Sequence, residues 1–348
     1  MKLKRIFRNT LEFCLANFTG NYGKGIIRYI SHKRDGGHPL AIAWNHVSSE
    51  DKQPISDLNI PLDNNYCPIC NNTSVMNTVS DQVQSCVGVK TRKILHSCQK
   101  CHYLFTNEER PERSEYFNKN PYSCNFDGTR SQREIDFAKL AANLINGNKE
   151  CNILIYAVGK NSTVKDLHKE GFINTWGSDI SDDILYDQHT INLAKNPNYF
   201  KEKEIKFDVI VACEVWEHYA REDINPAFEW LFDQLSDRGI IIGSTGLWMS
   251  NKKDNPFYNA PHEYGSEYLK WWTYPHDVDH TSFYRPCNLE TIGKRNNMVT
   301  KFACFNDKRV ENNDPSKLII AYTHSSNVGT ITKLDESFNN KFLNVYYG

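Results

Sequence analysis

Short apolar runs alternate with helical stretches from Asn152 onward, and this alternation constrains the fold more than any other feature of the chain. Phe207–Cys213 reads F-D-V-I-V-A-C, a run that indicates a strand buried on both faces. Asn152–Val158 and Gly239–Ser244 have the same texture, and Ile224–Leu235 has the spacing of an amphipathic helix. Strands that alternate with helices predict an α/β fold with a parallel sheet covered on both faces. Further strands are expected at Phe172–Trp176, Thr190–Leu193, Phe302–Phe305 and Leu318–Thr323, and helices at Ser131–Asn146, Ser162–Glu170 and from Asp182.

Length and charge narrow the classes of protein that this chain can be. Its 348 residues suggest two or three domains. Lys and Arg total 41 and Asp and Glu total 42, so the formal net charge of −1 argues against a protein that binds nucleic acid or anionic lipid through its overall charge. The apolar runs are far shorter than a membrane span or a signal peptide requires, so we expect a soluble cytoplasmic protein that has no membrane partner.

Four of the eleven cysteines form a regular pattern. Cys67 and Cys70, and then Cys98 and Cys101, make a C-x2-C, 27-residue gap, C-x2-C arrangement. Two cysteines separated by two residues can direct both sulfurs at one ion, and a hairpin over Thr73–Leu95 with a turn near Gly88 brings two such pairs together. The pattern predicts a structural Zn²⁺ site with no open coordination position, which ties down a small module that lacks the apolar surface to fold alone. Unconnected cysteines, a redox dithiol, or substitution of one ligand by the flanking His96 or His102 remain as alternatives.

These features divide the chain into five regions. Residues 1–60 form a partly helical arm, 61–106 the zinc-binding module and 107–149 a connector with a helix. Residues 150–325 form the sheet domain, and 326–348 a C-terminal tail. If the module is separate, loss of one metal ligand is expected to destabilise it and to leave the sheet domain folded.

Polar residues follow the strands at the edge where parallel sheets bind ligands, beyond the carboxyl ends of the strands. Ala157–Ser162 follows the first strand, Asp179 the second, Glu214–His218 the central strand and Gly243–Gly246 the next. A carboxylate has two acceptor oxygens, so Asp179 can accept hydrogen bonds from both hydroxyls of a ribose.

In these residues the sequence resembles class I S-adenosylmethionine (SAM)-dependent methyltransferases over about 150–325. The most specific part is Phe207–His218, which is similar to the F-D-x-I…E-V-x-E-H motif of the family and is followed by Leu235 and Gly239. The C-x2-C pairs, which end in the segment Cys101–Asn107, resemble the N-terminal module of some sugar-modifying methyltransferases. The resemblance implies a Rossmann-like fold and SAM as cofactor, bound by Ala157, Gly159, Asp179, Ile180, Asn192, Glu214 and Glu217.

The first loop departs from the pattern of the family. Ile155 stands at the usual acidic position, Ala157 replaces the first glycine and Asn161 the last, while Gly159 keeps the middle one. Alanine is the smallest possible change from glycine, and Gly159 still permits close approach of the backbone to a ligand.

The segment Trp271–Tyr284 is dense in groups that suit an acceptor site. It lies where the family places a substrate-binding insertion, and His280–Phe283 resembles the H-x-x-F segment of sugar and small-molecule relatives. Methyl transfer to a hydroxyl needs a base near neutral pH, for which histidine is suited. The candidates are His280 first, His276 second and His218 third. Asp277 or Asp279 is expected to orient a histidine, and the alternative is a second metal site formed by His276, Asp277, Asp279 and His280.

The hypothesis is therefore an enzyme that transfers a methyl group from SAM to a small polar acceptor. A hydroxyl of a sugar or nucleotide-linked sugar in surface-glycan biosynthesis is the expected acceptor, by analogy with relatives. Methylation of a sugar carbon also remains open, and two alternatives of other classes stay open. One is an RNA-modifying methyltransferase that reads nucleic acid with its zinc module, and the other is a non-catalytic binding protein with the same fold.

Overall fold

The computed structural model describes residues 66–73, 76–86, 89–98, 100–106, 129–181, 188–247, 280–304 and 318–337. The expected N-terminal arm, the helix from Asp182 and the segment from Trp271 to Asp279, which includes His276, lie outside these residues. None of the helices in the described ranges combines the length and the apolar character that a membrane crossing needs.

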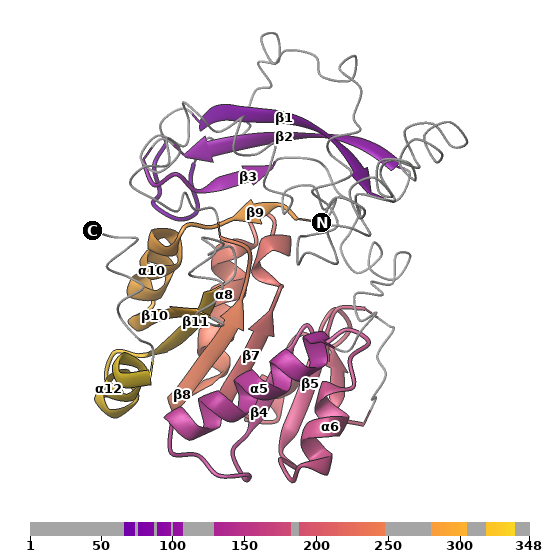
Figure 1. Cartoon of the computed structure of the whole chain (residues 1–348), viewed down its shortest axis with the longest axis vertical. Helices are drawn as coiled ribbons and strands as arrows, with labels where there is room; N and C mark the ends of the chain where they lie inside the picture. Colours follow the sequence, from indigo (N-terminus) through magenta and orange to yellow (C-terminus); the bar gives the residue numbers. More distant parts are fainter. Residues whose placement is uncertain are drawn as a thin grey trace, which may run out of the picture.

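A seven-stranded sheet forms the centre of the molecule, with strand order β10-β11-β8-β7-β4-β5-β6 (Figure 1). The strands from β6 to β8 pair in parallel, which confirms the expected parallel sheet. β11 is the exception, because it runs antiparallel to both β8 and β10. The strands are β4 (Ile153–Tyr156), β5 (Thr175–Asp179), β6 (Thr190–Asn192), β7 (Phe207–Cys213), β8 (Leu235–Ser244), β10 (Met298–Cys304) and β11 (Leu318–His324).

Helices cover both faces of this sheet, and alternation along β7 shows why every residue from Val209 to Cys213 is apolar. Val209 and Val211 pack into the cluster on the side of α5, α6 and α12, whereas Ile210 and Ala212 pack into the cluster on the side of α7, α8 and α10. In Figure 1, α5 and α6 lie in front of the sheet and α8 lies behind it. The helices are α5 (Thr129–Leu144), α6 (Thr163–Lys169), α7 (Tyr199–Glu202), α8 (Ile224–Gln234), α10 (Pro286–Arg295) and α12 (Val328–Ser337).

Three elements at the edges of this domain differ in extent or packing from what the sequence suggests. The strand expected at Phe172–Trp176 begins only at Thr175, because the N–H of Phe172 bonds to the carbonyl of Leu167 and so belongs to the turn that closes α6. The expected tail at 326–348 contains α12, whose Leu334 is fully buried. The helix of the expected connector, α5, packs directly on β7 and β8 and forms part of the domain core.

A second, smaller sheet carries the cysteine pairs and has the order β1-β2-β3-β9. The expected hairpin is confirmed, because β1 (Met76–Cys86) pairs antiparallel with β2 (Val89–Cys98). β3 (Leu104–Thr106) adds to β2, and β9 (Ser282–Phe283) then pairs with β3. β9 comes from the far end of the expected sheet domain, so this small sheet joins the two regions through backbone hydrogen bonds.

Asp208 ties three strands together at the edge of the large sheet where β7 begins. Its carboxylate accepts hydrogen bonds from the backbone of Asn152 at 3.1 Å, from Ser236 at 2.9 Å and from Arg238 at 3.0 Å. Burial by itself raises the pKa of Asp208, but these hydrogen bonds outweigh it and the net pKa is lowered.

Replacing Asp208 with asparagine should lower the free energy of unfolding by about 1–3 kcal/mol near neutral pH. A carboxyl group with a depressed folded-state pKa stabilises the protein above its unfolded pKa, and this contribution is lost as the pH falls through the folded pKa. Urea denaturation at neutral pH and at about pH 3 measures the free energy of unfolding of the wild type and of the Asp208→Asn variant. The difference between the two proteins should be smaller at the lower pH. The exposed neighbour Asp237, changed to asparagine, is the control, and an equal loss at both pH values would contradict the assignment.

Candidate active site

Asp179 ends β5 and organises the edge of the sheet that sequence analysis singled out. Its Oδ2 accepts a hydrogen bond from the backbone N–H of Gly159 at 2.8 Å. Its Oδ1 accepts from the N–H groups of Ile180 at 2.8 Å and Ser181 at 2.9 Å. The carboxylate thus links the tip of β5 to the loop that follows the neighbouring strand β4.

The loop after β4 has two residues in the left-handed region, Ala157 with φ of 55° and Gly159 with φ of 59°. Apart from its chain neighbours, no described heavy atom lies within 4 Å of the position that a Cβ at residue 159 would occupy. The backbone beside Asp179 therefore faces open space, and a ligand can approach it closely.

Replacing Ala157 with glycine should stabilise the folded protein. An L-residue with a Cβ in the left-handed region costs about 1–2 kcal/mol, and glycine avoids that cost at the price of some unfolded-state entropy. We expect Ala157→Gly to raise the free energy of unfolding by about 1 kcal/mol, measured by urea denaturation. Gly159→Ala is the matched opposite change at a similar φ and should lower the free energy of unfolding. A loss of stability in Ala157→Gly would contradict the inference that the backbone at Ala157 is strained.

The two other departures of this loop are explained by neighbouring side chains. Ile155 is fully buried in the apolar cluster beneath α5, so an apolar residue fits there better than an acid. Asn161, at the position of the last glycine, directs its Nδ2 at both carboxylate oxygens of Glu134 on α5, at 3.4 and 3.3 Å. Thr163 donates to the same carboxylate at 2.6 Å. Sequence analysis missed Glu134, because its partners lie 27 and 29 residues away.

Glu214 follows β7 with φ of 54° and lies beside a charge of the opposite sign. Its Oε1 accepts hydrogen bonds from Nη1 of Arg133 at 3.2 Å and from Oγ of Ser244 at 2.9 Å. Arg133 comes from α5 and was not expected from the sequence, whereas Ser244 ends β8 and belongs to the segment Gly243–Gly246 that sequence analysis placed at this edge. The expected binding residue Asn192 ends β6, where its Nδ2 donates to the carbonyl of Ser181 at 3.1 Å.

Glu217, His218 and His280 come together one turn beyond β7. One ligand atom of each lies within 4.8 Å of the others. Glu217 and His218 sit on the 3-10 helix η3 (Trp216–His218), and His280 precedes β9. The imidazole rings of His218 and His280 meet edge to face with centroids 4.8 Å apart. The structure thus unites two of the three histidines that sequence analysis proposed, and adds to them a buried carboxylate that it had grouped with the cofactor.

The backbone after His280 is held from two sides. The N–H of Thr281 donates to the carbonyl of Glu217 at 2.7 Å, and the carbonyl of Thr281 accepts from the N–H of Thr106 at 3.0 Å. The hydroxyls of Tyr103 and Ser282 are 2.6 Å apart, and Ser282 donates to the carbonyl of Tyr219. The strand that begins after the histidine is therefore bonded both to η3 and to the small sheet that carries the cysteines.

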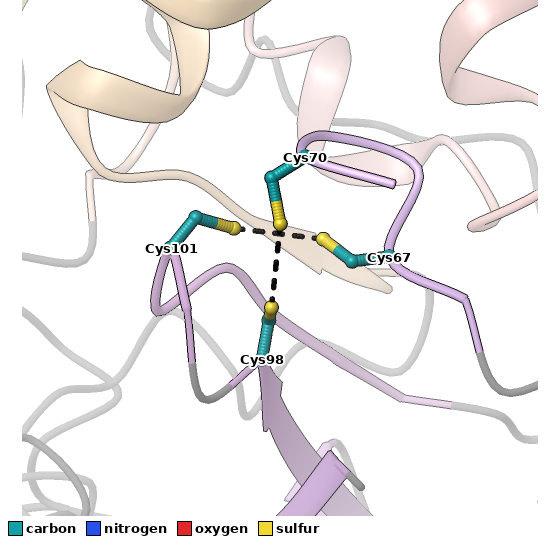
Figure 2. A group of neighbouring side chains, drawn as sticks. All are labelled: Cys67, Cys70, Cys98 and Cys101. Carbon is teal, nitrogen blue, oxygen red and sulfur yellow. Dashed lines mark hydrogen bonds between the residues drawn. The ribbon is translucent and has the colours of Figure 1, made fainter. Parts of the chain in front are cut away.

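The four expected cysteines converge on one point, as Figure 2 shows. The sulfurs of Cys67 and Cys101 are 3.5 Å apart, and those of Cys70 and Cys98 are 3.6 Å apart. All four are free thiols. Hydrogen bonds from Cys101 and Cys67 hold the pKa of Cys98 far below its usual value, while the hydrogen bond with Cys67 raises the pKa of Cys101.

The loops that bear these cysteines rest on helices of the large domain. Arg295 at the end of α10 donates to the carbonyl of Ile69 at 2.8 Å, and Asn288 donates to the carbonyl of Cys101 at 2.9 Å. Asn225 on α8 donates to the carbonyl of Pro68 at 3.1 Å. The cysteine cluster thus belongs to the same packed core as α8 and α10.

Comparison with known families gives a match over much of the large sheet. The sequence model of the methyltransferase domain family matches residues 137–299, from within α5 to within β10. The match confirms the expected fold, a Rossmann-like domain around a mostly parallel sheet. It begins before the expected boundary at 150, in agreement with the packing of α5 on the sheet.

Solved structures similar to the chain include three methyltransferases. A 1,6-didemethyltoxoflavin N1-methyltransferase from Burkholderia thailandensis is 8% identical with a TM-score of 0.39, over 66% of this chain and 98% of that one. A SAM-dependent methyltransferase from Archaeoglobus fulgidus is 14% identical with a TM-score of 0.41, over 61% and 99%. One from Clostridium acetobutylicum is 14% identical with a TM-score of 0.37, over 61% and 97%. The comparison with curated proteins finds no match.

Proposed function

We propose that this protein is a SAM-dependent methyltransferase that methylates a hydroxyl of a small polar acceptor. The observation that carries the proposal is the cradle formed by Asp179 and the backbone of Gly159, which opens beyond the carboxyl ends of β4 and β5 in a methyltransferase domain. A carboxylate beside an uncovered stretch of backbone suits a nucleoside, whose ribose hydroxyls donate hydrogen bonds.

Asp179 suits the ribose of SAM, and the pair of Glu214 and Arg133 suits its amino-acid group. Oδ2 of Asp179 accepts one hydrogen bond from Gly159, so it keeps capacity to accept another from a ribose hydroxyl. Glu214 and Arg133 offer opposite charges at the end of β7. Glu214 would hold the ammonium and Arg133 the carboxylate of an amino-acid group.

SAM, when bound, supplies a methyl group activated by its sulfonium. In the transfer the bond between carbon and sulfur breaks, a bond between carbon and the acceptor oxygen forms, and the hydroxyl proton leaves. The protein has to orient the acceptor in line with the methyl group and to take up that proton. We assign the acceptor side to the cluster of Glu217, His218 and His280, and a structural Zn²⁺ to the four cysteines, whose convergent sulfurs suit that ion.

The acceptor that we propose is a hydroxyl of a sugar or nucleotide-linked sugar. Side chains that can exchange hydrogen bonds with hydroxyl groups surround this cluster. Besides the two histidines, they include the hydroxyls of Thr245 and Thr281. Polar groups of this kind favour a hydroxyl-rich acceptor over an apolar one.

Calorimetry with SAM tests the cofactor assignment, and incubation with methyl-labelled SAM and a panel of nucleotide sugars tests the acceptor. We expect one SAM to bind per chain and label to appear in a sugar product. Absence of both heat and a thermal shift with SAM would refute the enzyme. Transfer of label to RNA, with a gel shift at low salt, would instead favour the RNA-modifying alternative.

A further inference from the structure

We propose that Glu217, His218 and His280 bind a divalent transition-metal cation, for which Mn²⁺ is the probe, and that this cation receives the acceptor hydroxyl. The role in the reaction rests on the proposed function, whereas the binding of the cation does not. The site is separate from the four cysteines and has a different chemistry, because its ligands are nitrogen and oxygen.

The distances within the cluster suit a shared ion. Nε2 of His280 is 3.9 Å from Oε1 of Glu217, which is too long for a hydrogen bond. Two ligands of one ion, each about 2.0–2.2 Å from it, lie about 3–4 Å apart. The two imidazole rings pack edge to face and not face to face. In this arrangement one nitrogen of each ring and a carboxylate oxygen of Glu217 all lie within 4.8 Å of one another.

The protein holds these ligands before any ion arrives. Oε2 of Glu217 accepts a hydrogen bond from Oγ1 of Thr245 at 2.7 Å, which leaves Oε1 on the side of His280. His280 is fixed through its neighbour Thr281, whose N–H and hydroxyl bond to the carbonyls of Glu217 and Tyr219. Partners that orient a ligating carboxylate or histidine in this way are typical of metal sites.

Burial of the cluster favours a bound cation over a solvated ion pair. The side chain of Glu217 is 0% exposed and that of His280 is 6% exposed, whereas His218 is only partly buried. A carboxylate in such a place is costly unless a positive charge or hydrogen bonds compensate it. The partly exposed His218 leaves a side from which an ion and an acceptor can enter.

The ligand set also indicates what the ion would do. Two imidazoles and one carboxylate suit divalent transition metals and leave coordination positions open, unlike four thiolates, which close the shell. A hydroxyl bound at an open position has a lowered pKa. It gives its proton to water, and its oxygen then forms the bond to the methyl carbon as the carbon–sulfur bond breaks. His280 is then a ligand and not the base.

A second histidine pair serves as an internal control. His168 and His189 also meet edge to face, with centroids 4.6 Å apart. Within the described ranges no carboxylate groups with that pair, and Nε2 of His168 bonds to the carbonyl of Thr175. We therefore expect no ion there, and His189→Gln should leave metal binding unchanged.

The test is a titration of the full chain with Mn²⁺, after one equivalent of Zn²⁺ has loaded the cysteines, with free Mn²⁺ followed by electron paramagnetic resonance. We expect one Mn²⁺ per chain. Glu217→Gln and His280→Gln should each weaken binding at least tenfold, and Thr245→Ala, which removes the orienting hydroxyl together with the γ-methyl group but no ligand, about 10- to 100-fold. Thermal denaturation checks that each variant is folded, and Thr245→Ala keeps the test decisive if the other two fail to fold.

No Mn²⁺ bound by the loaded wild-type protein, or wild-type affinity for Mn²⁺ in the folded Thr245→Ala and Glu217→Gln variants, would overturn the proposal. SAM calorimetry on the same samples separates this failure from that of the proposed function. Binding of SAM without Mn²⁺ binding removes only the metal site, and binding of Mn²⁺ without SAM binding supports the site while it removes the enzyme.

Discussion

Replacing Asp179 with alanine should lower the affinity of the protein for SAM by about 10- to 150-fold. A hydrogen bond to a charged group contributes about 1.5–3 kcal/mol, and the variant loses the acceptor that we assign to the ribose. It also removes the partner of three backbone N–H groups, those of Gly159, Ile180 and Ser181, so the loop after β4 loses its link to β5. Calorimetry measures the dissociation constant directly.

Two further variants separate the effect of charge from that of general damage. Asp179→Asn keeps the size and one acceptor oxygen, so we expect a smaller loss of affinity than with alanine. Asp136→Ala removes an exposed carboxylate of α5 and should leave the affinity unchanged. An unchanged dissociation constant in a folded Asp179→Ala protein would refute the ribose role.

The elements that sequence analysis placed correctly are those with a local signal. The apolar run Val209–Cys213 of β7, the amphipathic spacing of α8 and the paired cysteines each depend on residues close together in the chain, and the structure places all three as expected. Asp179 could be located for the same reason, because it lies three residues after the expected end of its strand at Trp176; in the structure it is the last residue of β5.

The features that sequence analysis missed depend on partners far apart in the chain. β9 has two residues and therefore no periodicity, yet its pairing with β3 joins the small sheet to the part of the chain that forms the large sheet. Glu134 had no local motif to mark it. The grouping of Glu217 with His280 spans 63 positions and depends on the path of the chain, which a pattern in the sequence does not reveal.

Cys67→Ser should release the metal that we assign to the cysteines and should loosen the acceptor side of the site as well. Metal binding supplies a large part of the folding free energy of small thiolate-bound modules, so the loss should amount to several kcal/mol. If the module were separate, as the sequence suggests, the destabilisation would be limited to residues 61–106. The contacts predict otherwise, because Tyr103 and Thr106 hold the strand that follows His280.

Hydrogen exchange followed by mass spectrometry measures how far the damage extends. We expect faster exchange in Cys67→Ser over β2, β3, β9 and η3, with protection retained in β4 and β7, whose hydrogen bonds lie in the other sheet. Cys287→Ser is the matched control, because Cys287 is an exposed thiol of α10 outside the cluster. It should keep both the metal and the exchange pattern of the wild type.

A milder variant tests the link without removing a metal ligand. Tyr103→Phe deletes only the hydroxyl that lies 2.6 Å from Ser282, and it should retain stoichiometric zinc while β9 exchanges faster. Retention of zinc in Cys67→Ser would contradict the ligand assignment. The link would be contradicted if exchange in Cys67→Ser became faster only within residues 66–106 and exchange of β9 stayed unchanged in both Cys67→Ser and Tyr103→Phe. That result would show that the cysteine sheet does not support His280. The coupling is expected because a two-residue strand has few backbone hydrogen bonds of its own, so its position depends on the sheet that it joins.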